Sequence, residues 1–203
     1  PLANFTGPIP TITYTVSDGN GGTDTSTLSL SMTAINDTPV NTLPASYTTN
    51  EDTALKLSGL SITDVDAASS NVTVTLSVAS GTLSAASAGG VTVANSGSAS
   101  ITLTGTVANI NSYLSTVANQ PTFTPVANAN GTVALTMTTN DGGNTGADPG
   151  LTGTATDERD TDTININVTA VNDAPIDGDE TNTVTEDTTL TVADGAAGDL
   201  LNN

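Results

Sequence analysis

The side chains of this sequence that could do chemistry are almost all oxygen donors. There are 21 Asp and Glu residues against two Lys and Arg residues, and the chain has no His and no Cys. No Ser stands in a motif that would place it beside a general base, so the sequence predicts no enzyme. Carboxylate and amide oxygens without nitrogen or sulfur ligands suit Ca²⁺, which takes about six to eight oxygens in flexible geometry.

The acidic residues in the central part of the chain avoid the middles of its predicted strands. They stand in loops and at strand ends, as Glu51-Asp52, Asp64-Val65-Asp66, Asp141, Asp157-Glu158, Asp160, Asp162 and Asn172-Asp173. In a β-sandwich such places gather at the two poles, where carboxylates from separate loops can share one ion. A pair of carboxylates could also hydrolyse a glycoside, but the aromatic platforms that usually hold sugars are missing.

The net charge of −19 disfavours anionic partners. Nucleic acid and anionic membranes are poor partners, because like charges repel. No stretch of about 18 apolar residues is present, so no direct membrane insertion is expected. Cations are the natural counterpart of this chain.

One phrase occurs twice, as TAINDTPV at 33–40 and as TAVNDAPI at 169–176. The match continues on both sides. PLANFTG (1–7) resembles PVANANG (125–131), VSDGNGG (16–22) resembles TNDGGNTG (139–146), and TTNEDTALKL (48–57) resembles VTEDTTLTV (184–192). These internal repeats predict that residues 1–38 are the last part of one unit, residues 39–174 a complete unit, and residues 175–203 the start of a third.

The complete unit is rich in strand patterns. VTVTLSVA (72–79), ASITLTG (99–105), TVALTMTT (132–139) and TDTININVTAV (161–171) alternate apolar with polar residues, which is typical of strands with one buried face. Around seven short strands predict an all-β fold, an immunoglobulin-type β-sandwich. The end pieces are too short to fold alone, since an isolated hairpin is marginal in water.

One segment of the complete unit has a different period. In TVANINSYLSTV (106–117) the apolar residues fall at helical spacing, at Val107, Ile110, Leu114 and Val117. Thr106 is a candidate N-cap. The segment predicts one short helix that links two strands.

Taken in order, these motifs resemble cadherin-like repeats of giant bacterial surface adhesins, the type I-secreted extender repeats of RTX adhesins. ITDVDAASSNVTVTLS (62–77) resembles the cadherin Asp-x-Asp pattern, NDGG (140–143) its Asp-Gly segment, and AVNDAP (170–175) its linker. Glu51 resembles the Glu at the far end of the first cadherin strand. The resemblance implies tandem immunoglobulin/cadherin-like β-sandwiches with Ca²⁺ at the junctions.

Two departures from the cadherin pattern bear on the number of ions. Ala34 and Ala170 stand where the cadherin linker usually has an additional Asp. The Asp-Arg-Glu segment is missing from its usual place, and DERD (157–160) precedes the last strand, which puts it at the other pole. We therefore expect roughly one or two ions per junction.

The resemblance implies two sets of metal ligands. The first set comprises Asn36 and Asp37 from the linker with Asp64, Asp66 and Asp141 from the complete unit, and Asp160 as a further candidate. The second set comprises Glu51, Asn172 and Asp173, together with an Asp-x-Asp beyond Asn203.

The function that the resemblance implies is structural. The chain is expected to be a calcium-stiffened extender of a long extracellular adhesin or cell-surface fibre, with neighbouring repeats of the same chain as its partners. A glycan-binding module that uses the loop at 141–160 is one alternative. A subunit of a self-assembling filament, with other copies ordering the end pieces, is another.

Overall fold

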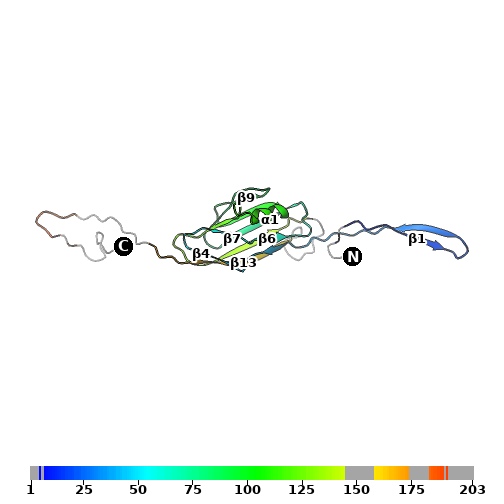
Figure 1. Ribbon diagram of the computed structural model, residues 1–203, viewed down its shortest axis with the longest axis horizontal. Coiled ribbons are helices and arrows are strands. Elements are labelled where there is room, and N and C mark those ends of the chain that lie inside the picture. The colour runs from blue at the N-terminus through cyan, green and yellow to red at the C-terminus, as the bar shows by residue number, and fades with distance from the viewer. Residues whose placement is uncertain (1–4, 6, 145–157, 174–182, 190, 192–203) are drawn as a thin grey trace. The chain divides into compact units, whose positions relative to one another are not determined.

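A computed structural model describes residues 5, 7–144, 158–173, 183–189 and 191 of the chain (Figure 1). Its contacts divide into two units, Pro1–Ala170 and Val171–Asn203, and each is described by itself. Strands dominate the described residues and one short helix joins them, so the predicted all-β fold is confirmed. The predicted repeat boundaries after residues 38 and 174 stay predictions.

The complete unit is built on a six-stranded sheet. In spatial order its strands are β4 (Ser46–Asn50), β13 (Arg159–Thr169), β12 (Gly131–Asn140), β7 (Asn71–Val78), β10 (Ser100–Thr106) and β9 (Thr92–Ala94). Four of the five neighbouring pairs are antiparallel. β4 pairs with β13 in parallel, with Ser46 opposite Asn165 and Asn50 opposite Thr169. β4 therefore lies at one edge of this sheet, beside β13, the last strand of the unit.

Shorter strands complete the sandwich. A three-stranded sheet has the order β5 (Leu55–Lys56), β11 (Thr122–Thr124) and β8 (Thr82–Ser84), and β3 (Val40–Thr42) pairs with β6 (Ser61–Thr63). The expectation of around seven strands was therefore too low. The additional strands have only two or three residues, which is too short for a period-two pattern to show in the sequence.

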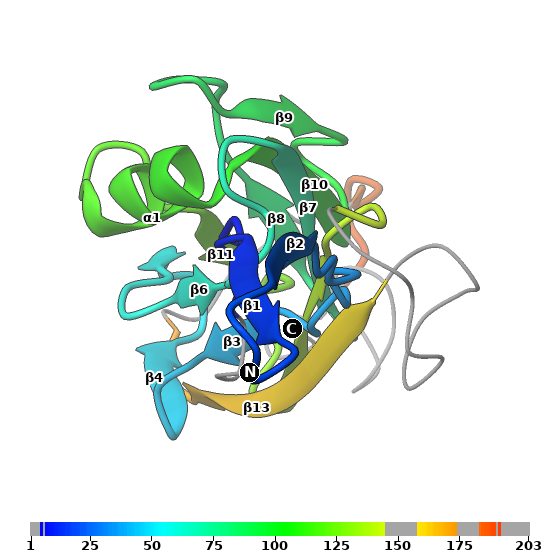
Figure 2. The same ribbon diagram turned by 90° about the vertical axis from the view of Figure 1, so that its right-hand side faces the viewer.

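The predicted helix is confirmed as α1 (Val107–Ser115), which lies beside β6 and β10 (Figure 2). Thr106 caps its N-terminus, because its hydroxyl accepts a hydrogen bond from the Asn109 N–H at 3.2 Å. Ile110 and Leu114 are buried on the core side of α1. Val117, which extends the apolar spacing in the sequence, lies beyond the helix and is 69% exposed.

The core is mainly aliphatic and includes a few aromatic side chains. Along β7 the residues Val72, Val74 and Leu76 are buried, while the intervening polar residues face outward. Residues of the short strands, such as Ile62 and Phe123, belong to the same buried cluster. Burial of such side chains supplies about 1.5–3 kcal/mol each, which is the main stabilisation of a sandwich with few charged contacts.

A separate hairpin precedes the complete unit. It consists of β1 (Ile12–Ser17) and β2 (Thr23–Leu28), which pair antiparallel with Ile12 opposite Leu28. Every residue of both strands is exposed. This exposure fits the expectation that the first piece of the chain lacks a core of its own.

The buried Tyr47 should make the folding stability of the sandwich fall at alkaline pH. Burial raises the pKa of its hydroxyl to about 12, and the hydroxyl donates a hydrogen bond to the Ser58 carbonyl at 2.5 Å. The unfolded chain ionises near pH 10, so the stability that Tyr47 contributes is fully present below about pH 10 and is lost as the pH rises to about 12. We expect Tyr47→Phe to cost about 1 kcal/mol at neutral pH, because the hydrogen bond is lost.

The wild type should lose roughly 2–3 kcal/mol of folding free energy between about pH 10 and pH 12 through ionisation of Tyr47, and Tyr47→Phe should not show this loss, since Phe cannot ionise. The free energy of unfolding in urea, measured against pH, checks both effects. Tyr14→Phe is the control, because Tyr14 is 49% exposed. Equal alkaline slopes in the wild type and in Tyr47→Phe would contradict this account.

Candidate metal centre

The linker residues Asn36 and Asp37 are held against the complete unit by hydrogen bonds. The Asn36 side-chain amide donates to Asp141 Oδ2 at 2.5 Å, and the backbone N–H of Asp37 donates to Asp66 Oδ2 at 2.6 Å. Asn36 is only 1% exposed. Four residues that the sequence analysis assigned to one ligand set are therefore brought together from three separate segments.

The Asp-x-Asp motif lies in the connection between β6 and β7. Asp64 Oδ1 accepts hydrogen bonds from the backbone N–H groups of Asp66 and Ala67, both at 2.9 Å. This is a local turn that Asp favours, because its short side chain reaches the backbone two and three residues further on. The turn buries Asp66 and aims its carboxylate at the linker.

Asp141 lies at the end of β12 and is fully buried. Its Oδ1 accepts from the backbone N–H groups of Gly143 and Glu158, at 2.8 and 2.9 Å, while its Oδ2 accepts from Asn36. Gly143 has a φ of 77°, a left-handed conformation that glycine adopts without strain. The Asp141 carboxylate therefore joins three elements: the loop after β12, the start of β13 and the linker.

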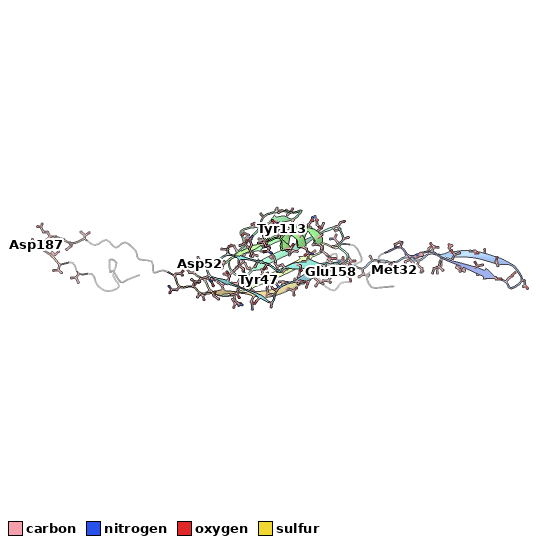
Figure 3. All side chains as sticks on the ribbon, viewed as in Figure 1. Met32, Tyr47, Asp52, Tyr113, Glu158 and Asp187 are labelled. Carbon is pink, nitrogen blue, oxygen red and sulfur yellow. The ribbon has the colours of Figure 1, made fainter. Side chains whose placement is uncertain are left out.

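Glu158 is a further acidic residue at this place, and the sequence analysis did not include it among the ligands. It is fully buried, and its Oε2 accepts a hydrogen bond from the Thr38 hydroxyl at 3.3 Å. Figure 3 labels Glu158 among the side chains of the sandwich. The signal that could have found it is the antiparallel pairing of β13 with β12, which sets Arg159 opposite Asn140 and so brings Glu158 back to Asp141, not to the other pole as the sequence analysis expected.

Asp160, the further candidate ligand, makes hydrogen bonds with Asn41. Its Oδ2 accepts from the backbone N–H of Asn41 at 2.7 Å, and its carbonyl accepts from the Asn41 side chain at 3.0 Å. Asn41 in turn accepts from the Thr139 hydroxyl at 2.5 Å. This polar network attaches β3 to β12 and β13, so the Asp160 carboxylate is engaged in the fold rather than with the other candidate ligands.

Two oxygens at the linker contact are buried and, within the part of the chain that the structure describes, have no hydrogen-bond partner. They are Asn36 Oδ1 and Asp64 Oδ2. A buried polar atom left without a partner costs about 1–3 kcal/mol, and more for a charged group. Both are hard oxygen acceptors of the kind that Ca²⁺ coordinates.

The electrostatics of the site also favour a cation. Burial raises the pKa of the Asp66 carboxyl, and the neighbouring charges of Asp37 and Asp64 raise it further, against the hydrogen bond from the Asp37 N–H. The ionised form of Asp66 is therefore less stable in the folded chain than in water, and a nearby cation would stabilise it.

The carboxylates of this region do not by themselves form a metal-binding group. Across residues 5, 7–144, 158–173, 183–189 and 191, no group of three or more His, Cys, Asp or Glu side chains is placed to hold a metal ion. Several of the acidic oxygens accept backbone N–H groups instead. A candidate donor set must therefore include amide oxygens, and Asn36, whose side-chain amide contacts Asp141, offers the buried oxygen Oδ1.

The predicted ligands of the second junction are divided between the two units, with Glu51 in the first and Asn172 and Asp173 in the second. Glu51 is buried at the end of β4, and its N–H donates to the Thr169 carbonyl at 2.9 Å. Asn172 and Asp173 belong to the second unit, where both are exposed and the Asn172 side chain donates to the Asp173 carbonyl at 3.2 Å. The loop of the glycan-binding alternative lies mostly outside the described residues.

Comparison with known proteins found a similarity in the first part of the chain. Residues 1–31 match the model of a bacterial Ig domain family. Comparison with curated proteins found no match. The matched segment contains both strands of the β1–β2 hairpin, so the similarity to a bacterial Ig domain falls on this hairpin. Among the described residues, no helix has the length and apolarity to cross a membrane.

The hydrogen bond from Asp37 to Asp66 predicts protection of one amide. We expect the Asp37 N–H to exchange with solvent slowly in the metal-free chain, because a buried carboxylate accepts it. Asp66→Ala should raise its exchange rate toward that of an open linker, while Asp24→Ala, in the exposed strand β2, should not. Amide exchange read by NMR tests this, and equal rates for Asp37 in all three chains would contradict it.

Proposed function

We propose that this chain is a calcium-stiffened extender module of a long extracellular bacterial surface protein. The observation that carries the proposal is the buried oxygen Asn36 Oδ1, which lies in the linker contact with Asp141 and has no partner among the described residues. The bacterial Ig-like sequence of residues 1–31 supports a module that stands in a row with others.

The residues that would hold the ion come from both sides of the junction. Asn36 and Asp37 would supply linker oxygens, and Asp64, Asp66, Asp141 and Glu158 would supply oxygens of the sandwich. The ion would neutralise carboxylates that repel one another and would tie the linker to the pole. Because hydrogen bonds already hold the linker, Ca²⁺ would tighten an existing contact rather than create one.

The segment that follows supports a straight exit from the linker. Pro39 disfavours a helical conformation of Thr38, so the chain continues extended into β3. An extended, ion-tied linker suits a spacer that projects a distal binding domain of an adhesin. Extracellular calcium modules bind with dissociation constants of about 10⁻⁴–10⁻³ M, which matches fluids outside the cell. We therefore propose secretion to the bacterial cell surface, with neighbouring repeats as partners.

Removal of the Asp-x-Asp charges should abolish the strongest calcium binding. We expect the double replacement Asp64→Asn and Asp66→Asn to weaken it by at least tenfold, because Ca²⁺ affinity follows ligand charge. The matched control is Asp24→Asn with Asp187→Asn, which removes the same charge from two exposed positions. Isothermal titration calorimetry of the whole chain measures the affinity.

A second replacement separates a ligand role of Asn36 from its hydrogen bond. Asn36→Asp keeps an oxygen in place, whereas Asn36→Ala removes it. We expect Asn36→Ala to lose calcium affinity and Asn36→Asp to retain it. Strong calcium binding that survives both the double Asp replacement and Asn36→Ala would refute the assignment of this site.

A further inference from the structure

Two Asn-Gly dipeptides occur in the sequence, Asn20-Gly21 and Asn130-Gly131. An Asn that precedes a Gly can lose its side-chain amide without an enzyme, because the Gly has no Cβ to keep its backbone nitrogen away from the Asn side chain. Asn20 and Asn130 are both exposed, so access to solvent does not distinguish the two sites. The hydrogen bonds of the two Gly backbone N–H groups do distinguish them.

Asn20-Gly21 lies in the turn between β1 and β2. The Asp18 N–H donates to the Gly22 carbonyl at 3.1 Å, and Asp18 Oδ1 accepts from the N–H groups of Asn20 and Gly22 at 2.8 and 2.9 Å. The Gly19 N–H donates to a Ser hydroxyl at 3.3 Å. The Gly21 N–H differs from these, since it has no hydrogen-bond acceptor among the residues that the structure describes.

Asn130-Gly131 lies at the start of β12, where the Gly N–H belongs to the β-ladder. The Asp141 N–H donates to the Glu158 carbonyl, and in an antiparallel pair every second residue repeats this pattern. Gly131 lies an even number of residues before Asp141 and opposite Val168 in an unbroken register. Its N–H is therefore directed at the Val168 carbonyl.

We propose that Asn20 is a site of spontaneous deamidation and that the β-ladder protects Asn130 from it. The backbone nitrogen of Gly21 gives up its proton to a base in the solvent and attacks Cγ of Asn20, which closes a succinimide ring. The bond from Cγ to Nδ2 breaks, and Nδ2 takes up a proton and leaves as ammonia. Water then adds to either carbonyl of the ring and opens it, which leaves Asp or isoaspartate at position 20.

The hydrogen bond of the Gly N–H matters because the reaction removes that proton. At Gly131 the bond to Val168 must first be broken by local opening of the ladder, which makes the reactive state rare. The Gly21 N–H has no such bond to break. A Cβ placed on Gly21 would meet nothing within 4 Å, so the surroundings of its backbone nitrogen are also open.

Deamidation changes the turn in which it occurs. Either product places a carboxylate close to that of Asp18, and like charges repel. The hydrogen bond from the Asn20 side chain to the Asp18 carbonyl, at 3.4 Å, is lost. Isoaspartate also lengthens the backbone of a turn that sets Ser17 opposite Thr23. The reaction uses no residue of the candidate metal centre, so this proposal and the calcium proposal can fail separately.

Peptide mapping by mass spectrometry of the whole chain, incubated at mildly alkaline pH, tests the proposal. Pepsin is the suitable protease, because two Lys and Arg residues give trypsin few sites and the acidic digestion stops deamidation. The exchange of NH₂ for OH raises the mass of the peptide that holds the modified Asn. We expect Asn20 to react at least about tenfold faster than Asn130 in the folded chain, because Asn130 must wait for local opening.

Two controls separate the effect of structure from that of sequence. In urea that unfolds the chain, Asn20 and Asn130 should react at similar rates, because each precedes a Gly. Asn20→Gln keeps an amide but would need a larger ring, so position 20 should then keep its mass while Asn130 reacts as in the wild type. An Asn20 that reacts no faster than Asn130 in the folded chain, or a difference that persists in urea, would overturn the proposal.

Discussion

The hydrogen bond between the Asn36 amide and the Asp141 carboxylate is the contact on which the junction depends. It joins positions 105 residues apart and is buried. Asp141 can accept it because its other oxygen already holds the loop after β12 and the start of β13 in place. One oxygen of Asp141 is held by the sandwich and the other binds Asn36, so the carboxylate fixes the linker against the sandwich. Asn36 and Asp37 of the linker therefore pack against this end of the sandwich.

Charge explains why this contact should respond to ions. The chain has almost no basic residues, so its acidic side chains must be satisfied by backbone N–H groups, by amides or by cations. At the linker contact, backbone N–H groups and the Asn36 amide satisfy part of the set, while Asn36 Oδ1 and Asp64 Oδ2 are buried and have no hydrogen-bond partner among the described residues. The sandwich core is mainly aliphatic and contains no member of this set, since its stability comes from burial of apolar side chains. Ion binding should therefore change the stiffness of the junction while the fold of the sandwich persists.

Much of the fold could be predicted from the sequence, because strong periodicity reflects a long element with one buried face. β7, β12 and β13 show it over eight or more residues, and α1 shows helical spacing after a capping Thr106. Strands such as β5 and β9 were missed because two or three residues carry no period and depend on tertiary pairing.

The contacts of the candidate site could be predicted from the sequence where a local motif makes them, and less so where strand pairing brings the residues together. Asp64 and Asp66 belong to a turn that their own side chains build, so the sequence displays it. Glu158 reaches the site only because β13 returns beside β12, after a loop that separates it from Asp141 along the chain. Asp160 lies in the same strand, β13, but its carboxylate accepts a hydrogen bond from Asn41 of β3. This contact depends on how β3 packs, which the sequence around Asp160 does not reveal.

The distance between the hairpin and the sandwich, with and without calcium, tests the central claim most directly. The chain has no Cys, so spin labels can be attached at Thr27→Cys in β2 and Asn167→Cys in β13 without competing thiols, and both positions are exposed. Pulsed electron–electron double resonance then measures the distribution of distances between the labels. The account predicts a distribution that narrows in millimolar Ca²⁺ and widens in chelator, with no narrowing when Asp64 and Asp66 are replaced by Asn. Equal widths in Ca²⁺ and in chelator would contradict it.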